Sequence, residues 1–145
     1  MPPLNDNRNT PEAMGRIRRG SVAAGALIHA GAMLMRDVAG DLAPATAATG
    51  SVGVGRAEMR VDNSGGAAGD ETVDFVPGTF RYENSAGADE ITAAASGALC
   101  YAVDDQTVAL TDGGGARSPA GTVDHVDELG VWVRFDEALT RAAAA

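Results

Sequence analysis

The chain has 145 residues, room for one ordinary domain, and 29 alanines and 19 glycines leave it few large core side chains. Eleven arginines and no lysine face 20 acidic residues, for a net charge of −9. Phosphates would repel so acidic a chain, so no nucleic acid partner is expected. No apolar run approaches the roughly 20 residues needed to cross a bilayer, so no membrane partner is expected either.

The beginning of the chain lacks the basic and apolar stretches of a signal peptide, so we expect a protein made and kept inside a cell. Cys100 is the single cysteine and has no internal disulfide partner. Packing, strand pairing or neighbouring subunits must therefore hold the fold. The aspartate excess without lysine suits a halophilic, salt-rich cytoplasm, and a GC-rich coding bias would also replace lysine with arginine.

Residues 1–20 are predicted to form a basic, extended N-terminal arm. They hold four arginines against two acids, whereas the rest of the chain holds seven arginines against 18 acids. The arm has few large apolar residues, so alone it cannot offset its ordering entropy. It is either a disordered tail without a role or an arm that docks on an acidic surface of a partner. The candidate binding residues of such an arm are Leu4, Arg8, Arg16, Ile17, Arg18 and Arg19.

Residues 21–135 are predicted to form a β-rich domain of short strands. Brief apolar runs at 26–28 and 33–35 precede an alternating stretch at 51–61. Pro77-Gly78 then lies between two strand-like runs, which predicts a hairpin closed by a type II turn. Further runs follow at residues 99–103, 107–110, 121–126 and 131–135. Turn residues separate these runs about every 8 to 12 positions, which predicts an all-β fold, a small β-barrel or β-sandwich.

Helix is predicted at only two places. Residues 91–98 favour two helical turns with Thr92 as N-cap, and residues 136–145 favour a short C-terminal helix or tail. The segments 62–67 and 83–88 share the order acid-Asn-Ser-x-Gly-Ala. We interpret both as Asx-type turns that end equivalent strands, with duplication of a hairpin as the alternative.

The chain offers little material for catalysis. Without lysine it has no P-loop, and Ser96 lacks the surroundings of a nucleophile elbow. His29, His125 and Cys100 are too few for a structural zinc site, and strand alternation predicts His125 on the side opposite its neighbours. Cys100 is expected to be buried in its strand. No enzyme activity and no cofactor are expected, although a small hydrolase or lyase remains an alternative.

Carboxylates cluster at two places in the predicted turns. Asp70, Glu71 and Asp74 follow the loop that begins at Asp62, and a second group lies at residues 104–112. Carboxylate oxygens are ligands that calcium prefers, but neither place has the order of a known calcium loop. These carboxylates are therefore either solvated turn residues or ligands of a bound cation.

The second half of the chain resembles small capsid-associated proteins of tailed viruses and prophages, a family sometimes labelled as predicted RecA/RadA-type phage recombinases. The resemblance spans about residues 20–135 and rests on residues 77–85, 91–94, 97–98, 101–111, 121–123 and 131–133. It implies a decoration (cement) protein with no catalytic residues. The recombinase label conflicts with the missing ATP-binding lysine and the acidic body.

The resemblance also implies partners and a location. Decoration proteins of this kind sit on the outer surface of the virion head, often as trimers, and clamp neighbouring major capsid protein subunits. We therefore expect the major capsid protein and further copies of this chain, as a homotrimer, as partners. The alternative is a non-catalytic β-sandwich binding module on a virion or host surface, for which Trp132, Tyr82 and Tyr101 are the available aromatic residues.

Overall fold

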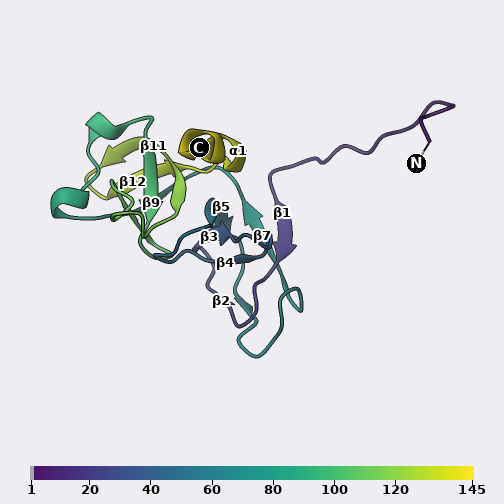
Figure 1. Cartoon of the computed structure of the whole chain (residues 1–145), viewed down its shortest axis with the longest axis horizontal. Helices are drawn as coiled ribbons and strands as arrows, with labels where there is room; N and C mark the ends of the chain where they lie inside the picture. Colours follow the sequence, from purple (N-terminus) through teal and green to yellow (C-terminus); the bar gives the residue numbers. More distant parts are fainter. Residues whose placement is uncertain (1) are drawn as a thin grey trace.

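A computed structural model describes residues 2–145, so Met1, the first residue of the predicted arm, lies outside the description. The body consists of short strands with one α-helix, which confirms the predicted all-β class. Residues 2–17 form no strand or helix and run away from the body as an extended segment (Figure 1). The body itself contains two β-structures, and strands of the first pack against the second.

The first β-structure is a curled antiparallel sheet. Its order is β1-β7-β5-β3-β4, and its two ends meet where Val22 forms a bridge with Leu42. A two-stranded sheet of β2 and β6 covers it. The strands are β1 (Arg18–Ser21), β2 (Leu27–Ile28), β3 (Met33–Arg36), β4 (Leu42–Pro44), β5 (Val52–Ala57), β6 (Val61–Asp62) and β7 (Thr72–Val76). This sheet encloses a first core of Val22, Ile28, Leu34, Leu42, Val54, Ala57, Val61, Val73 and Phe75.

The second β-structure is a closed five-stranded barrel in the order β10-β8-β12-β11-β9. All neighbours pair antiparallel except β8 and β10, which run parallel. The strands are β8 (Thr79–Asn84), β9 (Leu99–Ala102), β10 (Thr107–Ala109), β11 (Pro119–Asp127) and β12 (Gly130–Arg134). The barrel core is apolar and includes Tyr82, Ile91, Cys100, Val108, Val123, Val131, Val133 and Phe135.

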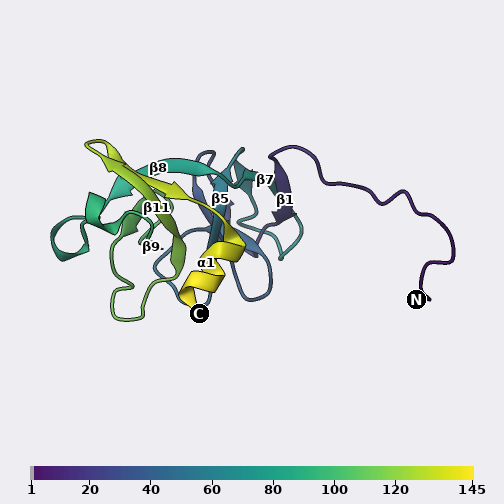
Figure 2. The same cartoon turned by 90° about the horizontal axis from the view of Figure 1, so that it is seen from above.

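Strands β3 and β5 join the two β-structures into one unit. Along β3, Leu34 packs in the first core, while Met33 and Met35 pack in the barrel core. Strand β5 lies so close to β11 that a Cβ atom on Gly53 would overlap the main chain of Ala120. The helix α1 (Glu137–Ala144) packs against β5 and β11 (Figure 2). The predicted single β-rich domain therefore has two cores with a common wall.

The predicted hairpin at Pro77-Gly78 is wrong. Strand β7 pairs with β1 and β5 in the first sheet, whereas β8 pairs with β10 and β12 in the barrel. Gly78 is not among the glycines with positive φ, so it does not occupy the type II position. Its carbonyl oxygen accepts a hydrogen bond from the N–H of Phe135, 2.7 Å away. The dipeptide is thus a corner at which the chain crosses from one β-structure to the other.

The predicted helix at residues 91–98 is reduced to one 3-10 turn, Ala93–Ala95, which follows another at Gly87–Asp89. Thr92 is its N-cap but makes no side-chain capping bond. Gly97, with φ +84°, donates its N–H to the carbonyl of Val123 in the barrel, so the segment ends there and does not continue as a helix.

The C-terminal helix forms as predicted. Its N-cap is Asp136, whose carboxylate accepts a 3.0 Å hydrogen bond from the N–H of Leu139. Glu137 in the first turn and Arg141 in the last complement the helix dipole and pair with each other at 3.1 Å. Local capping thus starts the helix, and packing on β5 and β11 holds it.

The two repeated turn segments do not end equivalent strands. The first follows β6 of the two-stranded sheet, and the second follows β8 of the barrel. In the first, Asp62 accepts from the N–H of Ser64 as in an Asx turn. What the segments share is an asparagine clamp: Asn63 donates to the carbonyls of Ala23 and Ala67, and Asn84 bonds both main-chain polar groups of Ile91.

One buried polar group has no partner among residues 2–145. Thr140 on α1 is fully buried, and its Oγ1 makes no hydrogen bond. An unpaired buried hydroxyl costs stability because its hydration is lost without compensation. We expect Thr140→Val, which keeps the shape and removes the hydroxyl, to raise the free energy of unfolding by about 1 kcal/mol. Urea unfolding measures this change. The control Thr140→Ala leaves a void and should lower the free energy of unfolding. A valine variant less stable than the parent chain would show that the Thr140 hydroxyl does have a hydrogen-bond partner.

Candidate functional site

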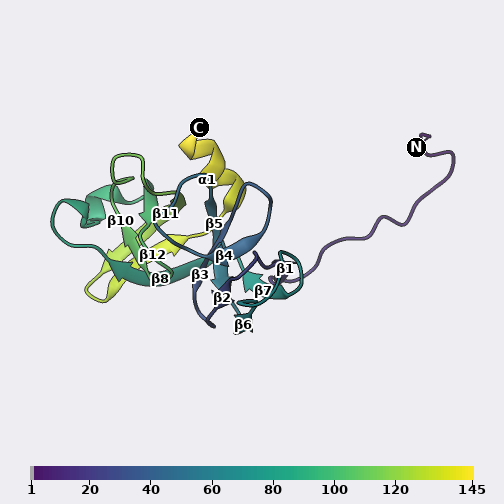
Figure 3. The ribbon, with the colours of Figure 1, turned by 60° about the horizontal axis from the view of Figure 1, so that its bottom comes forward.

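The outer part of the predicted arm is fully available for contact. Leu4 is 73% exposed, Met14 83% and Ile17 59%. Arg8 and Arg16 are exposed and form no hydrogen bond or ion pair with the rest of residues 2–145. The segment leaves the body in an extended course in all three views (Figures 1–3), so these side chains are spread along it and do not form one patch.

The last residues of the predicted arm belong to the body. Strand β1 begins at Arg18 and pairs antiparallel with β7. Arg18 donates to the carbonyls of Gly15 and Ile17, at 3.0 and 3.1 Å. Arg19 makes a two-pronged ion pair with Asp74 on β7, with Nε 2.7 Å from Oδ1. Arg18 and Arg19 thus belong to the sheet through strand pairing, with Arg19 also fixed by its ion pair, and the segment outside the sheet is residues 2–17.

The ion pair of Arg19 also sets the titration of its partner. The Arg19 guanidinium, through its hydrogen bond and charge, lowers the pKa of Asp74 below its usual range. We expect Arg19→Gln to raise the pKa of Asp74 toward that of a free aspartate. NMR titration of the Asp74 carboxyl carbon measures this shift, and an unchanged titration would contradict the pairing.

This pair has a defined effect on stability against pH. A carboxylate with a lowered pKa stabilises the fold at pH values above its unfolded pKa. That contribution is lost as the pH falls through the folded pKa, when Asp74 takes up a proton. As the pH falls into the acid range, the free energy of unfolding should therefore decrease less steeply in Arg19→Gln than in the parent chain.

Strand β1 is an edge of the first sheet. It pairs with β7 along its whole length, while on its other side, within the part of the chain that the structure describes, the single bridge is that of Val22, just past its end, with Leu42 of β4; Arg18–Ser21 have no strand partner there. Unpaired main-chain N–H and C=O groups at an edge can pair with a strand of another chain. The free segment thus continues directly into a strand that has pairing capacity left.

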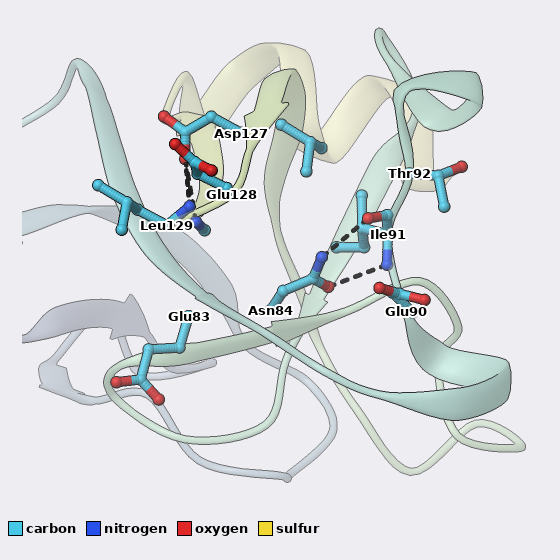
Figure 4. A pocket seen from close by; sticks show the side chains of 10 residues that line it. Glu83, Asn84, Glu90, Ile91, Thr92, Asp127, Glu128 and Leu129 are labelled. Carbon is cyan, nitrogen blue, oxygen red and sulfur yellow. Dashed lines mark hydrogen bonds between the residues drawn. The ribbon is translucent and has the colours of Figure 1, made fainter.

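A cavity of about 490 Å³ opens between β8, the segment after it and the tip of the β11–β12 hairpin (Figure 4). Four carboxylates line it, from Glu83, Glu90, Asp127 and Glu128. No histidine, cysteine or serine lines it. Asn84 holds Ile91 across its floor with hydrogen bonds of 2.8 and 2.9 Å. Thr92 supplies the one side-chain hydroxyl of the lining.

Asp127 in that cavity serves the hairpin tip. Its carboxylate accepts from the indole N–H of Trp132 at 2.8 Å and from the N–H groups of Leu129 and Gly130. These bonds, the one from Trp132 first, lower the pKa of Asp127. The Asp127 carboxylate thus uses its hydrogen bonds to hold the β11–β12 turn in place.

Other carboxylates considered as cation ligands form hydrogen bonds or ion pairs with nearby residues. Asp70 accepts from the N–H of Ala67, Asp62 from Ser64, and Asp74 pairs with Arg19. Within residues 2–145, no three side chains of His, Cys, Asp or Glu are grouped so that they could hold a metal ion.

Cys100 is buried, as predicted. Its exposed fraction is zero, and its Sγ lies 3.6 Å from the carbonyl oxygen of Gly121. Burial raises the pKa of this thiol to about 12. It is therefore held protonated and shielded from reagents at neutral pH.

The prediction that His125 faces away from its neighbours holds for Val126, which packs against the barrel core, but is wrong for Asp124. A bulge in β11 between Val123 and His125 breaks the alternation and leaves Asp124 and His125 both exposed. His125 Nδ1 lies 2.6 Å from a carboxylate oxygen of Asp124. Its ring stacks on Trp132, with 5.2 Å between the centroids.

Trp132 lies between two partners that sequence reasoning did not connect with it. Arg81 of β8 faces it in register from one side, with its guanidinium 5.7 Å from the indole centroid. His125 of β11 faces it from the other side. The three residues come from separate strands, so only the strand register brings them together. Below, Arg81, Trp132 and His125 are called the Trp132 ridge.

The remaining findings concern the chain as a whole. Among residues 2–145, no helix combines the length and apolar character required to span a bilayer. No protein-family model, curated protein or solved structure matches the chain.

Proposed function

We propose that this chain is a capsid decoration protein that binds the outside of a tailed-virus head through its N-terminal arm and braces contacts between major capsid protein subunits. The observation that carries the proposal is the exposed segment of residues 2–17, joined to the folded body through the edge strand β1. The resemblance of residues 20–135 to capsid-associated proteins supplies the identity of the partner.

The exposed side chains of the segment favour binding to a protein surface. Leu4, Met14 and Ile17 are all more than half exposed. Burying each against a partner would contribute about 1.5–3 kcal/mol. Arg8 and Arg16 are free to pair with carboxylates on the same partner.

The entropy of ordering decides how the segment would bind. Fixing the backbone costs about 1–2 kcal/mol for each residue, which over residues 2–17 exceeds what three apolar side chains contribute. Main-chain pairing with a partner strand, continued from β1, would supply the missing stabilisation. Repetition over many subunit junctions then multiplies a modest binding energy for each copy.

The alternative function is a non-catalytic binding module, and the partly exposed Trp132 on the barrel is the feature that favours it. Light scattering on the purified chain separates the two proposals. A stable homotrimer, as the resemblance implies, favours the capsid role, whereas a monomer favours the module.

Co-sedimentation tests the capsid role. Heads of the virus whose genome encodes the chain are assembled without it and mixed with the purified chain. We expect saturable pelleting at a fixed ratio to the major capsid protein. Heads that already carry their full complement serve as the control and should take up no more; a chain that stays in the supernatant at every concentration would refute the proposal.

A further inference from the structure

The outer face of the barrel carries a second surface suited to binding, at the Trp132 ridge. β12 lies between β8 and β11, so Arg81 and His125 flank the indole from opposite sides. The indole N–H is fixed by Asp127 at 2.8 Å. These contacts hold the ring of Trp132 in one orientation while leaving it partly exposed.

A depression of about 300 Å³ adjoins the ridge and has no acidic lining residue; Gly31, Arg56, Phe80, Arg81, Tyr82 and Trp132 line it. The Arg56 guanidinium stacks 4.2 Å from the centroid of the Phe80 ring. The Tyr82 hydroxyl donates to the carbonyl of Gly31, 2.9 Å away. Two guanidinium groups and three aromatic rings thus border one hollow.

Within residues 2–145, Arg81 is the arginine of this surface that forms no ion pair, and it donates no hydrogen bond. The other arginines after residue 21 each have a carboxylate within 4 Å: Arg36, Arg56, Arg60, Arg117, Arg134 and Arg141. Arg81 has a longer-range charge interaction with Asp127, which is already hydrogen-bonded to Trp132. In a chain of net charge −9, an exposed guanidinium positioned by an aromatic ring, with no carboxylate in ion-pair contact, can still pair with an external one.

The surroundings narrow the class of ligand. A sugar ring stacks on a free aromatic face, but Arg81 and His125 flank the indole on both sides. A nucleic acid would bring many phosphates toward a body with strong negative charge. A short acidic segment of a protein brings few charges and can add an apolar side chain for the rings of Phe80 and Trp132. Tryptophan, tyrosine and arginine are also the residues that dominate binding energy at protein interfaces.

We propose that the Trp132 ridge and the adjoining depression form a docking surface for an acidic, apolar-containing segment of a partner protein. A carboxylate of the segment pairs with Arg81, and an apolar side chain rests against Phe80 and the edge of Trp132. This surface is separate from the N-terminal segment and does not depend on the capsid proposal.

Trp132 is the single tryptophan of the chain, so its fluorescence reports on this surface directly. The full chain is titrated at low ionic strength with a synthetic peptide of alternating glutamate and leucine. We expect a saturable change in Trp132 emission. Arg81→Gln should weaken the apparent affinity at least tenfold, because the charged hydrogen bonds to the peptide are lost.

Arg60→Gln is the matched control. It makes the same change of charge at an exposed arginine outside both β-structures, 3.9 Å from Asp62, and should bind like the parent chain. Circular dichroism and thermal unfolding check that both variants fold.

Four results would overturn the proposal. They are no saturable response to the acidic peptide, an equal loss of affinity in Arg60→Gln, equal binding of a lysine–leucine peptide, and tripolyphosphate binding as tightly as the acidic peptide. A change in Trp132 emission on dilution without peptide, abolished by Arg81→Gln, would assign the surface to a second copy of the chain and would also overturn it.

Discussion

Gly53→Ala is expected to lower the free energy of unfolding by about 3 kcal/mol or more. A Cβ atom at this position would overlap the carbonyl oxygen, carbonyl carbon and Cα of Ala120 on β11. Main-chain atoms of a barrel strand cannot move aside as a flexible side chain can, so the two β-structures would have to separate. The contact between β5 and β11 is where the first sheet meets the barrel.

Chemical denaturation of the parent chain and of Gly53→Ala measures this effect. Gly65→Ala is the matched control. Gly65 has no heavy atom within 4 Å of the added Cβ and no positive φ, so its variant should unfold within about 0.5 kcal/mol of the parent chain. Equal stability of Gly53→Ala and the parent chain would contradict the close packing of the two β-structures.

Removal of residues 1–15 is expected to leave the body folded and to weaken binding to heads at least a hundredfold. The deletion spares β1 and the pair of Arg19 with Asp74, so thermal unfolding should be nearly unchanged. It removes Leu4 and Met14 together with most of the main chain that would pair with the partner, and their joint loss is expected to exceed the roughly 2.7 kcal/mol that a hundredfold change represents. Co-sedimentation with heads measures the affinity.

A charge-only variant separates the two contributions of the segment. Arg8→Gln with Arg16→Gln keeps the apolar side chains, so its affinity should lie between that of the parent and that of the truncated chain, with a weaker dependence on salt. A longer deletion through Arg19 is unsuitable because it would remove half of β1. Full occupancy of heads by the chain without residues 1–15 would refute the role of the segment.

The sequence was sufficient for features that depend on near neighbours. Asp136 and the acidic first turn predicted the terminal helix, and alternation predicted strands such as residues 131–134 of β12. It did not predict the pairing of strands, because partners lie far apart in the chain. Pro77-Gly78 has the residues of a hairpin turn, yet β7 and β8 find their partners in different sheets. Tertiary packing here overrides a local preference.

In the candidate sites, too, the contacts between residues far apart in the chain could not be predicted. Arg19 was predicted to belong to a free arm, but Asp74 lies opposite it across β1 and β7, 55 residues away in the chain. The Trp132 ridge depends on the register of three strands and on the bulge at His125. No local pattern indicates that bulge, so alternation did not predict that Asp124 and His125 would both be exposed.

Electron cryo-microscopy of purified heads tests most directly whether this chain works by bracing other proteins. The account predicts density for the two-core body on the outer surface at each local three-fold position, with residues 2–17 extended over a neighbouring capsid subunit. Heads from cells that make the chain in quantity, but whose outer surface shows no such density, would contradict it.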